Sequence, residues 1–175
     1  ATLDTLLDIG DIRSIPRIST AARLDKHRLA LLAGDTAAAQ RLMALLADQS
    51  MQRPLEGLST YAEDLDDLLV AQARQALVEG SVGSIIPRLQ DAICEAGARS
   101  RHRRVARLQC LLAQAFEVAR RRPQALDTLE RALLQAHKGG MVRVFVDEPW
   151  HLGGLLDALA TRRTGVPPPY LQELL

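Results

Sequence analysis

Three parts of the chain repeat one pattern, in which two stretches with helical spacing of apolar residues flank a short turn. Gly80 lies 46 residues after Gly34, and Arg120 lies 40 residues after Gly80. This spacing fits stacked helical hairpins somewhat longer than the ~34-residue TPR unit, and periods near 40 also occur in HEAT and armadillo arrays, so the repeat class stays open. With these three turns aligned, the coinciding apolar residues are Ala39, Ile85 and Ala125, then Met43, Leu89 and Leu129, then Leu46, Ala92 and Ala132.

The composition favours helices over strands. Hydrophobic residues make up 47% of the 175 residues, but aromatic residues only 3%. The apolar content is therefore mostly Leu and Ala, which are strong helix formers, while strand-favouring residues are sparse. We predict a single all-α domain of antiparallel helical hairpins stacked as a TPR-like right-handed superhelix. Its hairpin units span approximately 19–48, 63–97 and 101–138, and a C-terminal capping segment spans 141–175.

Turn and capping residues separate the predicted helices. Asp35 follows the first turn and is expected to be the N-cap of a helix over residues 36–47. A loop is predicted over residues 49–59, and Ser84 is a candidate cap for a later helix. An acidic cluster after the loop is interpreted as a helical first turn rather than a metal site, because carboxylates suit the positive end of a helix dipole. The cluster consists of Glu63, Asp64, Asp66 and Asp67.

The last part of the chain departs from the repeat. Residues 141–146 are rich in Val and are expected to be either extended or a tight turn leading to a helix. Asp147 or Glu148 is expected to cap a leucine-rich helix. Three prolines at 167–169 predict an extended break, and a short helix is predicted from Tyr170.

A motif runs through this tail, and it resembles the end of the sensor domain in MalT-like LuxR-family transcription regulators. Members of that family typically show Gly-x-x-Arg-x-Phe-x-Asp-Glu-Gly and then a leucine-rich helix; Pro149 stands where they usually have Gly. The resemblance covers roughly residues 125–175. The residues that carry it are Ala132-Leu133-Leu134-Gln135-Ala136, Gly139-Gly140, Arg143-Val144-Phe145-Val146-Asp147-Glu148, Leu152, Leu155-Leu156, Tyr170 and Leu174-Leu175.

The resemblance implies that the chain is the C-terminal part of a sensor superhelix. In the family, an NTPase module and a winged-helix segment precede the superhelix, and a DNA-binding helix-turn-helix follows it. DNA would then be bound only through a helix-turn-helix outside this chain. The motif residues are expected to have structural roles, closing the end of the superhelix, with direct ligand contact as the alternative. They are Arg143, Phe145, Asp147, Glu148, Leu155 and Leu156.

No pattern typical of an active site occurs in the sequence. There is no Gly-x-Ser-x-Gly elbow, and the stretch at 80–84 lacks the Gly-Lys-Ser/Thr end of a P-loop. The histidines show no metal-ligand spacing and are interpreted as surface or helix-end residues. We therefore predict no catalytic residues, no metal site and no cofactor. The histidines are His27, His102, His137 and His151.

Charge is nearly balanced overall, at a formal net +1, but it is uneven along the chain. Residues 1–85 hold 8 Lys and Arg against 12 Asp and Glu, a net of −4, and residues 86–175 hold 14 against 9, a net of +5. The basic stretch over residues 99–107 is interpreted as a solvated helix start. Contact with an acidic partner or anionic ligand, and contact with DNA, are the alternatives. Residues 120–122, all Arg, predict an exposed turn.

A superhelix of hairpins presents a concave face lined by the first helix of each pair. Carrying the TPR pattern through the repeat alignment makes Arg28, Arg74 and Gln114 equivalent, with Arg107 one to two turns before Gln114. These side chains are candidates for gripping a peptide or a small anionic or polyol effector, and the alternative is that they are ordinary surface residues. Replacing Arg74 and Arg107 by Ala is expected to abolish effector binding.

Cellular location is inferred from cysteine use and hydropathy. Cys94 and Cys110 form no CxxC motif, and each is expected to be a buried structural thiol, which fits a reducing cytoplasm. The sequence contains no signal peptide and no apolar run near the ~18–20 residues needed to cross a bilayer, so no membrane contact is predicted. The chain begins with Ala1 rather than Met, and we expect it to belong to a longer polypeptide.

Two functions from different classes remain. The first is a non-catalytic sensor that binds a small-molecule effector or a protein partner and so controls self-association and DNA binding by the parent regulator. The second is a TPR-like adaptor that assembles proteins and has no small-molecule effector. An effector-dependent change of oligomeric state separates the two.

Overall fold

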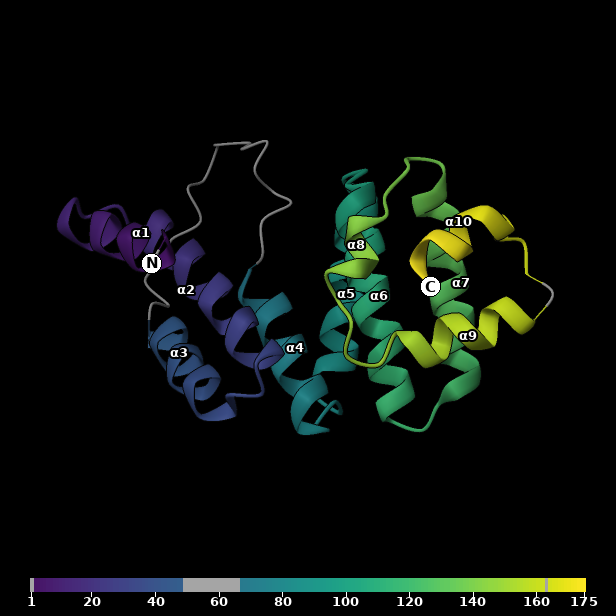
Figure 1. Ribbon diagram of the computed structural model, residues 1–175, viewed down its shortest axis with the longest axis horizontal. Helices are drawn as coiled ribbons and strands as arrows, with labels where there is room; N and C mark the ends of the chain where they lie inside the picture. The colour runs from purple at the N-terminus through teal and green to yellow at the C-terminus, as the bar shows by residue number, and fades with distance from the viewer. Residues whose placement is uncertain (1, 49–66, 163) are drawn as a thin grey trace. The chain divides into compact units, whose positions relative to one another are not determined.

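The computed structural model describes residues 2–48, 67–162 and 164–175 (Figure 1). These residues form helices joined by turns and loops, and none of them lies in a strand, which confirms the predicted all-α class. Contacts divide the chain into two compact units, Ala1–Gln75 and Ala76–Leu175, which are considered separately.

The first unit consists of α1 (Thr2–Ile12), α2 (Pro16–Leu32), α3 (Thr36–Asp48) and the first turns of α4 (Leu68–Glu79). Helix α2 packs against both α1 and α3. A small apolar cluster joins α2, α3 and α4, and partly buried Met43 packs against it. Its members are Leu24, Leu46 and Ala71.

Helices α1 and α2 approach closely at Gly10. A Cβ atom there would lie 2.4 Å from the Oγ of Ser19 and 2.7 Å from its backbone nitrogen. The Ser19 hydroxyl donates to Oδ1 of Asp11 at 2.7 Å, and Arg23 also pairs with this carboxylate. The close approach therefore depends on a residue without a side chain at position 10.

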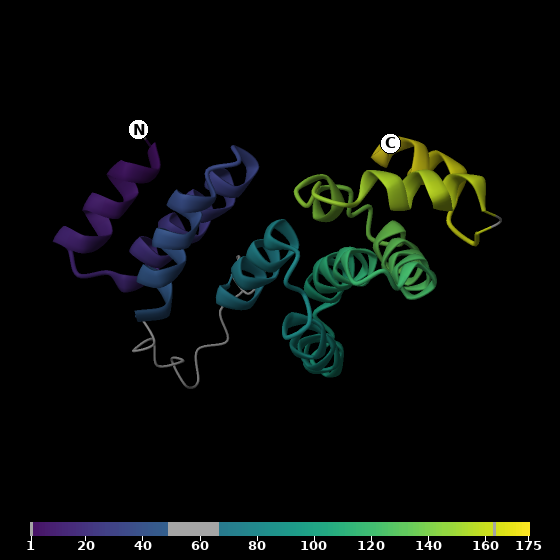
Figure 2. The same ribbon diagram turned by 90° about the horizontal axis from the view of Figure 1, so that it is seen from below.

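In the second unit α5 (Ile85–Ala98), α6 (His102–Val118) and α7 (Arg122–His137) lie side by side in chain order (Figures 1 and 2). Helix α6 is the centre of the unit, because α5 and α7 both pack against it and every residue from 111 to 116 is buried. The α6–α7 pair matches the predicted hairpin at 101–138.

The tail folds back onto this hairpin through three short helices, α8 (Arg143–Val146), α9 (Gly153–Thr161) and α10 (Pro168–Leu174). Helix α8 contacts α6, α9 contacts α7, and α10 contacts α9 (Figure 1). The stretch at 141–146 is thus not extended: a turn at 139–142 leads into one turn of helix, as the second of the two expectations had it.

Two predictions for the tail are wrong in detail. Neither Asp147 nor Glu148 caps α9, whose N-cap position is Leu152 and has no side-chain cap. Of the three prolines, only Pro167 is extended, with φ −59° and ψ 128°, and the other two begin α10. Proline suits a first helical turn because the N–H it lacks would have no helical partner there.

Six of the helices in the described ranges end in the same left-handed turn. In each, a residue one to three positions after the helix has a positive φ, and the N–H of the residue that follows it donates to the carbonyl oxygen five residues earlier, the hydrogen bond of a Schellman motif. The turn residues are Ser14 (φ 52°), Gly34 (75°), Gly80 (73°), Ser100 (55°), Arg120 (61°) and Gly140 (60°).

These turns reveal a finer period than the hairpin repeat. In the second unit the turn residues follow at intervals of 20 residues, from 80 to 100, 120 and 140, and the first unit has the same interval from 14 to 34. One helix with its turn therefore takes 20 residues and a hairpin takes 40. The interval of 46 between Gly34 and Gly80 contains residues 49–66, outside the described residues.

Carboxylates cap two helices. Oδ1 of Asp35 accepts from the backbone N–H of Ala38 at 2.9 Å, which confirms the predicted N-cap of α3. Oδ1 of Asp67 accepts from the N–H of Val70 at 2.9 Å at the start of α4. Ser84 occupies the N-cap position of α5, but its side chain makes no capping hydrogen bond. The rest of the acidic cluster, the start of the predicted unit 63–97 and the predicted loop 49–59 lie outside the described residues.

Two burial predictions need correction. Cys110 is buried as expected, but Cys94 is exposed, because it lies on the solvent side of α5. His27 is fully buried rather than at the surface, and its Nε2 lies 2.9 Å from Oε1 of Gln75, so a polar partner accompanies its burial. The remaining three histidines are exposed: His102, His137 and His151.

Candidate functional site

The side chain of Gln114 joins the central helix of the second unit to the tail. Gln114 is fully buried in α6. Its Nε2 donates to the carbonyl oxygen of Glu148 at 3.1 Å, and its Oε1 accepts from the backbone N–H of His151 at 2.9 Å. Both ends of one amide thus bind the backbone of the connection between α8 and α9, which we call the tail clamp.

Apolar packing surrounds the tail clamp. Phe145 precedes the clamped residues in the sequence and Leu155 follows them; both are fully buried, and Leu156 retains 3% exposure. A buried amide without partners destabilises a fold, whereas here it satisfies two backbone groups of a loop that lacks secondary structure. The clamp therefore fixes where the tail chain crosses α6.

Most of the motif residues lie in the interior of the second unit, and the helix-capping role expected of Asp147 or Glu148 is not found. Phe145, Leu155 and Leu156 are buried, and the side chain of Glu148 is also fully buried. Nη2 of Arg143 lies 3.5 Å from Oδ1 of Asp147, and the arginine side chain is 80% exposed, so this ion pair is a weak surface contact. Asp147 ends α8 as its C-cap residue.

The four residues predicted for a concave face fall into different environments. Arg28 and Arg74 belong to the first unit, and Arg107 and Gln114 belong to the second. Arg28 and Arg107 are partly buried, whereas Arg74 is only 2% exposed and Gln114 is fully buried. The prediction that all four line an open groove therefore needs correction for Arg74 and Gln114. For Gln114 the reason is the tail, which covers the position that a TPR pattern leaves open.

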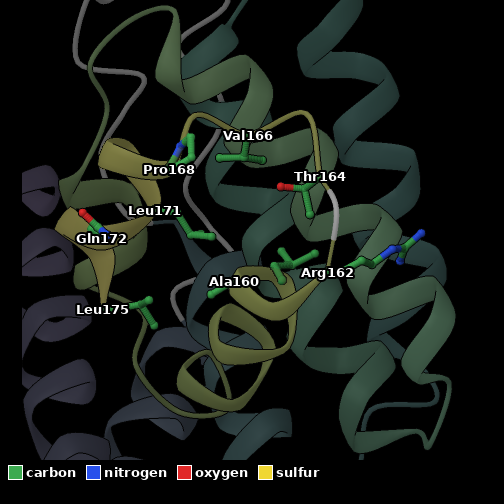
Figure 3. A pocket seen from close by; sticks show the side chains of 9 residues that line it. Ala160, Arg162, Thr164, Val166, Pro168, Leu171, Gln172 and Leu175 are labelled. Carbon is green, nitrogen blue, oxygen red and sulfur yellow. The ribbon is translucent and has the colours of Figure 1, made fainter.

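A pocket of about 310 Å³ lies between the end of α9, the following loop and α10 (Figure 3). Figure 3 shows the hydroxyl of Thr164 directed toward the space beside Val166 and Leu171, while the guanidinium of Arg162 points away from it. Local sequence patterns do not indicate this pocket, because its walls meet only after the tail has folded. Its lining consists of Leu159, Ala160, Arg162, Thr164, Val166, Pro168, Leu171, Gln172 and Leu175.

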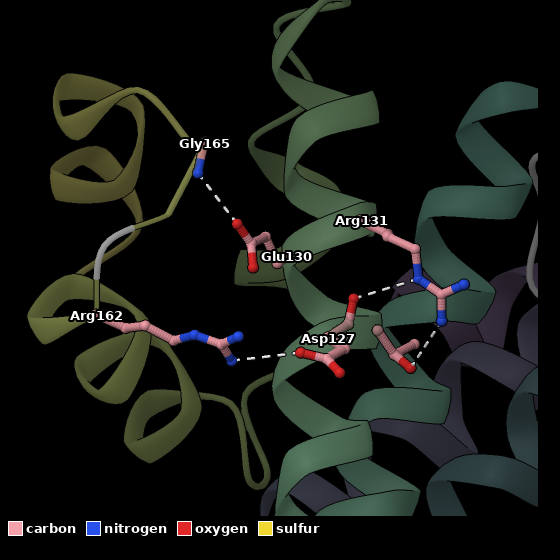
Figure 4. A network of polar contacts seen from close by, with 6 residues as sticks. Asp127, Glu130, Arg131, Arg162 and Gly165 are labelled. Carbon is pink, nitrogen blue, oxygen red and sulfur yellow. Dashed lines mark hydrogen bonds and ion pairs between the residues drawn. The ribbon is translucent and has the colours of Figure 1, made fainter.

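Two carboxylates of α7 hold the loop that forms one wall of this pocket (Figure 4). Oδ1 of Asp127 lies 3.3 Å from Nη1 of Arg162, and Oε1 of Glu130 accepts from the N–H of Gly165 at 3.0 Å. The two carboxylates are one helical turn apart on α7 and therefore share a face. The charge of Arg162 is directed to α7 and not into the pocket.

The other end of α10 is anchored by Tyr170. Its hydroxyl donates to the carbonyl oxygen of Met141 at 2.9 Å, and its ring contacts that of His137 with centroids 5.1 Å apart. Burial, together with the nearby charge of Glu173, raises the pKa of Tyr170 to about 12. The phenol is thus neutral and able to donate at physiological pH.

The basic stretch extends from the end of α5 into α6. Nη2 of Arg99 pairs with Oε1 of Glu95 at 3.0 Å, and Arg103 is exposed. At the opposite end of α6, the three arginines of residues 120–122 are exposed, as predicted. The guanidinium of Arg121 lies 4.8 Å from the centroid of the Phe116 ring, and Arg122 donates to the carbonyl oxygen of Gly154 at 3.2 Å. The Arg122 contact joins the α6–α7 turn to α9.

Two other kinds of site are absent from residues 2–48, 67–162 and 164–175. No group of three or more His, Cys, Asp or Glu side chains there is arranged to hold a metal ion. Over the same residues, no helix combines the length and the apolar character needed to cross a membrane.

Comparison of the chain with protein-family models, with curated proteins and with solved structures gave no match. The resemblance to MalT-like regulators therefore depends on the motif residues of the tail alone.

Proposed function

We propose that this chain is a non-catalytic sensor and protein-interaction domain of a MalT-like LuxR-family transcription regulator. It binds a small-molecule effector or a protein partner, and this binding controls self-association and DNA binding by the parent protein in the cytoplasm. Its helical hairpins stack as a TPR-like right-handed superhelix. DNA is contacted only by a helix-turn-helix beyond this chain.

The tail clamp is the observation that carries this proposal. The motif that resembles the family is held against α6, since Gln114 hydrogen-bonds to the backbone at Glu148 and at His151 directly after the motif's Asp147-Glu148 pair. A motif with buried Phe145 and Glu148 at the end of a helical hairpin fits a segment that closes a superhelix. The regular interval of 20 residues between helix ends in the second unit also favours a repeat architecture.

Coupling between a ligand and an oligomeric state requires different affinities for two states of the protein. The tail supplies an element that can take part in such a difference, because it contacts α6 and α7 only through short helices and their connecting loops. Of the four residues predicted to contact an effector, Arg28 and Arg107 are partly exposed and remain candidates for that contact.

The adaptor function is the alternative, and sedimentation velocity separates the two. The intact parent protein is measured alone and with representative small ligands, sorbitol as a polyol and citrate as an organic anion. A sensor changes its sedimentation coefficient with one such ligand class, and Arg107→Ala removes the response while Arg143→Ala, at an exposed position of the tail, leaves it unchanged. A protein that associates only with other proteins, whichever ligand is added, supports the adaptor.

A further inference from the structure

The pocket between α9 and α10 has the size and lining of a small-molecule site. Its volume of about 310 Å³ is at the lower end of the ~300–1,000 Å³ typical of such sites. Six of its nine lining residues are apolar, and three of these, Leu159, Val166 and Leu171, belong to the buried core of the tail. An occupant must therefore be small and mostly apolar.

The polar groups of the pocket define the rest of the ligand. Arg162 is the one charged residue in the described lining, and its guanidinium is directed to Asp127 of α7 (Figures 3 and 4). The guanidinium is thus directed away from the pocket space, so it is poorly placed to pair with an anion there. The hydroxyl of Thr164, in contrast, points inward and can donate or accept one hydrogen bond (Figure 3).

We propose that this pocket binds a small uncharged amphiphile, with an apolar body and a single hydrogen-bonding oxygen that contacts the Thr164 hydroxyl. The apolar body lies against Val166 and Leu171. The proposal depends on the sensor function for its biological meaning, because the pocket would then hold the effector, but binding itself can be measured on this chain alone.

The pocket lies beside residues that contact α7, so a bound ligand can affect these contacts. Arg162, Thr164 and Val166 line one side of the pocket, and Asp127 and Glu130 of α7 bind Arg162 and Gly165. A ligand that contacts Thr164, which lies between these two residues in the sequence, would stabilise the contact between the tail and the α6–α7 hairpin.

Four probes with the same aromatic body test the proposal by isothermal titration calorimetry on the 175-residue chain. They are benzyl alcohol, toluene, benzoate and benzylamine. For a molecule of this size we expect benzyl alcohol to bind with a dissociation constant on the order of 1 mM. Toluene should bind about fivefold more weakly because it lacks the hydrogen-bonding oxygen, and both charged probes should bind more weakly than the alcohol.

Two variants locate the binding. Thr164→Val removes the hydroxyl and keeps the shape, so it should abolish the fivefold preference for benzyl alcohol over toluene. Ala160→Leu adds bulk at an exposed lining position of α9 and should weaken both neutral probes at least tenfold. Thr161→Val is the matched control, because the Thr161 hydroxyl bonds to carbonyls of its own helix outside the lining, and it should bind like the parent chain.

Each outcome has a clear meaning. Preference for benzyl alcohol that is lost in Thr164→Val and retained in Thr161→Val supports the proposal. Absence of binding by both neutral probes, tighter binding of benzoate, or equal effects of the two threonine variants would overturn it. None of these results bears on whether the chain belongs to a transcription regulator, so failure of the pocket and failure of the proposed function are distinguishable.

Discussion

Replacing Gln114 by Leu should separate the tail from α6. Leu has a similar volume, so little cavity is created, but it removes the donor to Glu148 and the acceptor for His151. Each hydrogen bond contributes about 1 kcal/mol net, and placing an apolar Leu side chain against these buried backbone polar groups costs about 1 kcal/mol more. The free energy of unfolding of the second unit should therefore fall by about 3 kcal/mol.

Urea unfolding measures this loss. Trp150, the single tryptophan of the chain, lies inside the clamped connection, so its fluorescence reports the second unit. With a denaturant slope of about 2 kcal/mol per M, the midpoint followed by Trp150 fluorescence should fall by roughly 1.5 M. Circular dichroism follows the loss of helix in the same samples.

The matched control is Gln109→Leu in the same helix. Oε1 of Gln109 is buried and has no hydrogen-bond partner within the described part of the chain. Removing a buried polar atom that lacks a partner should leave stability unchanged or raise it, because no hydrogen bond is lost. Equal losses in the two variants, or a Gln114→Leu chain as stable as the parent, would show that the tail clamp contributes no specific stability.

Three further predictions concern backbone geometry and pH. Gly10→Ala should destabilise the first unit by about 2 kcal/mol, because the added Cβ would clash with the backbone of Ser19. The control Gly97→Ala has open space around the added Cβ, so thermal unfolding should show a free energy of unfolding higher by about 0.5–1 kcal/mol. Arg120→Gly should raise the free energy of unfolding by about 0.5–1 kcal/mol in urea titrations, since glycine adopts a φ of 61° without steric cost. The pKa of Tyr170 is raised from 10.0 to about 12, so the stabilisation that the neutral phenol gives to the tail is complete below pH 10 and is lost as the pH rises toward 12. The Tyr170→Phe variant should be about 1 kcal/mol less stable at neutral pH. When proteolysis of the tail is followed against pH, this variant should not show the loss of protection between pH 10 and about 12.

Local signals explain the parts of the fold that the sequence predicts well. Helix α7 begins with Pro123 in its first turn and ends before Gly139-Gly140, and both signals act within a few residues. The capping role of Asp35 is equally local. The repeat alignment paired Gly34, Gly80 and Arg120, and all three adopt a positive φ.

Other features depend on contacts between distant residues. The Val-rich stretch at 141–146 has strand propensity, but packing of Val144 and Phe145 in the interior of the second unit accompanies one turn of helix there. Helix α1 was not predicted, because the repeat alignment starts after it and its side chains Leu6 and Ile9 are 38% exposed. A local alignment has no means of including it.

The candidate site was predicted only in part. The TPR pattern predicted Gln114 as a ligand-contacting residue of an open groove, but the side chain is buried by a tail that returns to α6 from 34 residues further along the chain. The pocket beside Thr164 needs α9, a loop and α10 in their final places, and none of these has a signal for ligand binding in its own sequence. Short-range patterns therefore identify residues, while the direction a side chain faces depends on tertiary contacts.

The most direct test of the proposed function is to read the coding sequence on both sides of this chain. A sensor domain of a MalT-like regulator predicts a helix-turn-helix soon after Leu175 and a P-loop NTPase module far upstream. A stop codon directly after Leu175, or an unrelated domain there, would contradict the regulator function and favour the adaptor.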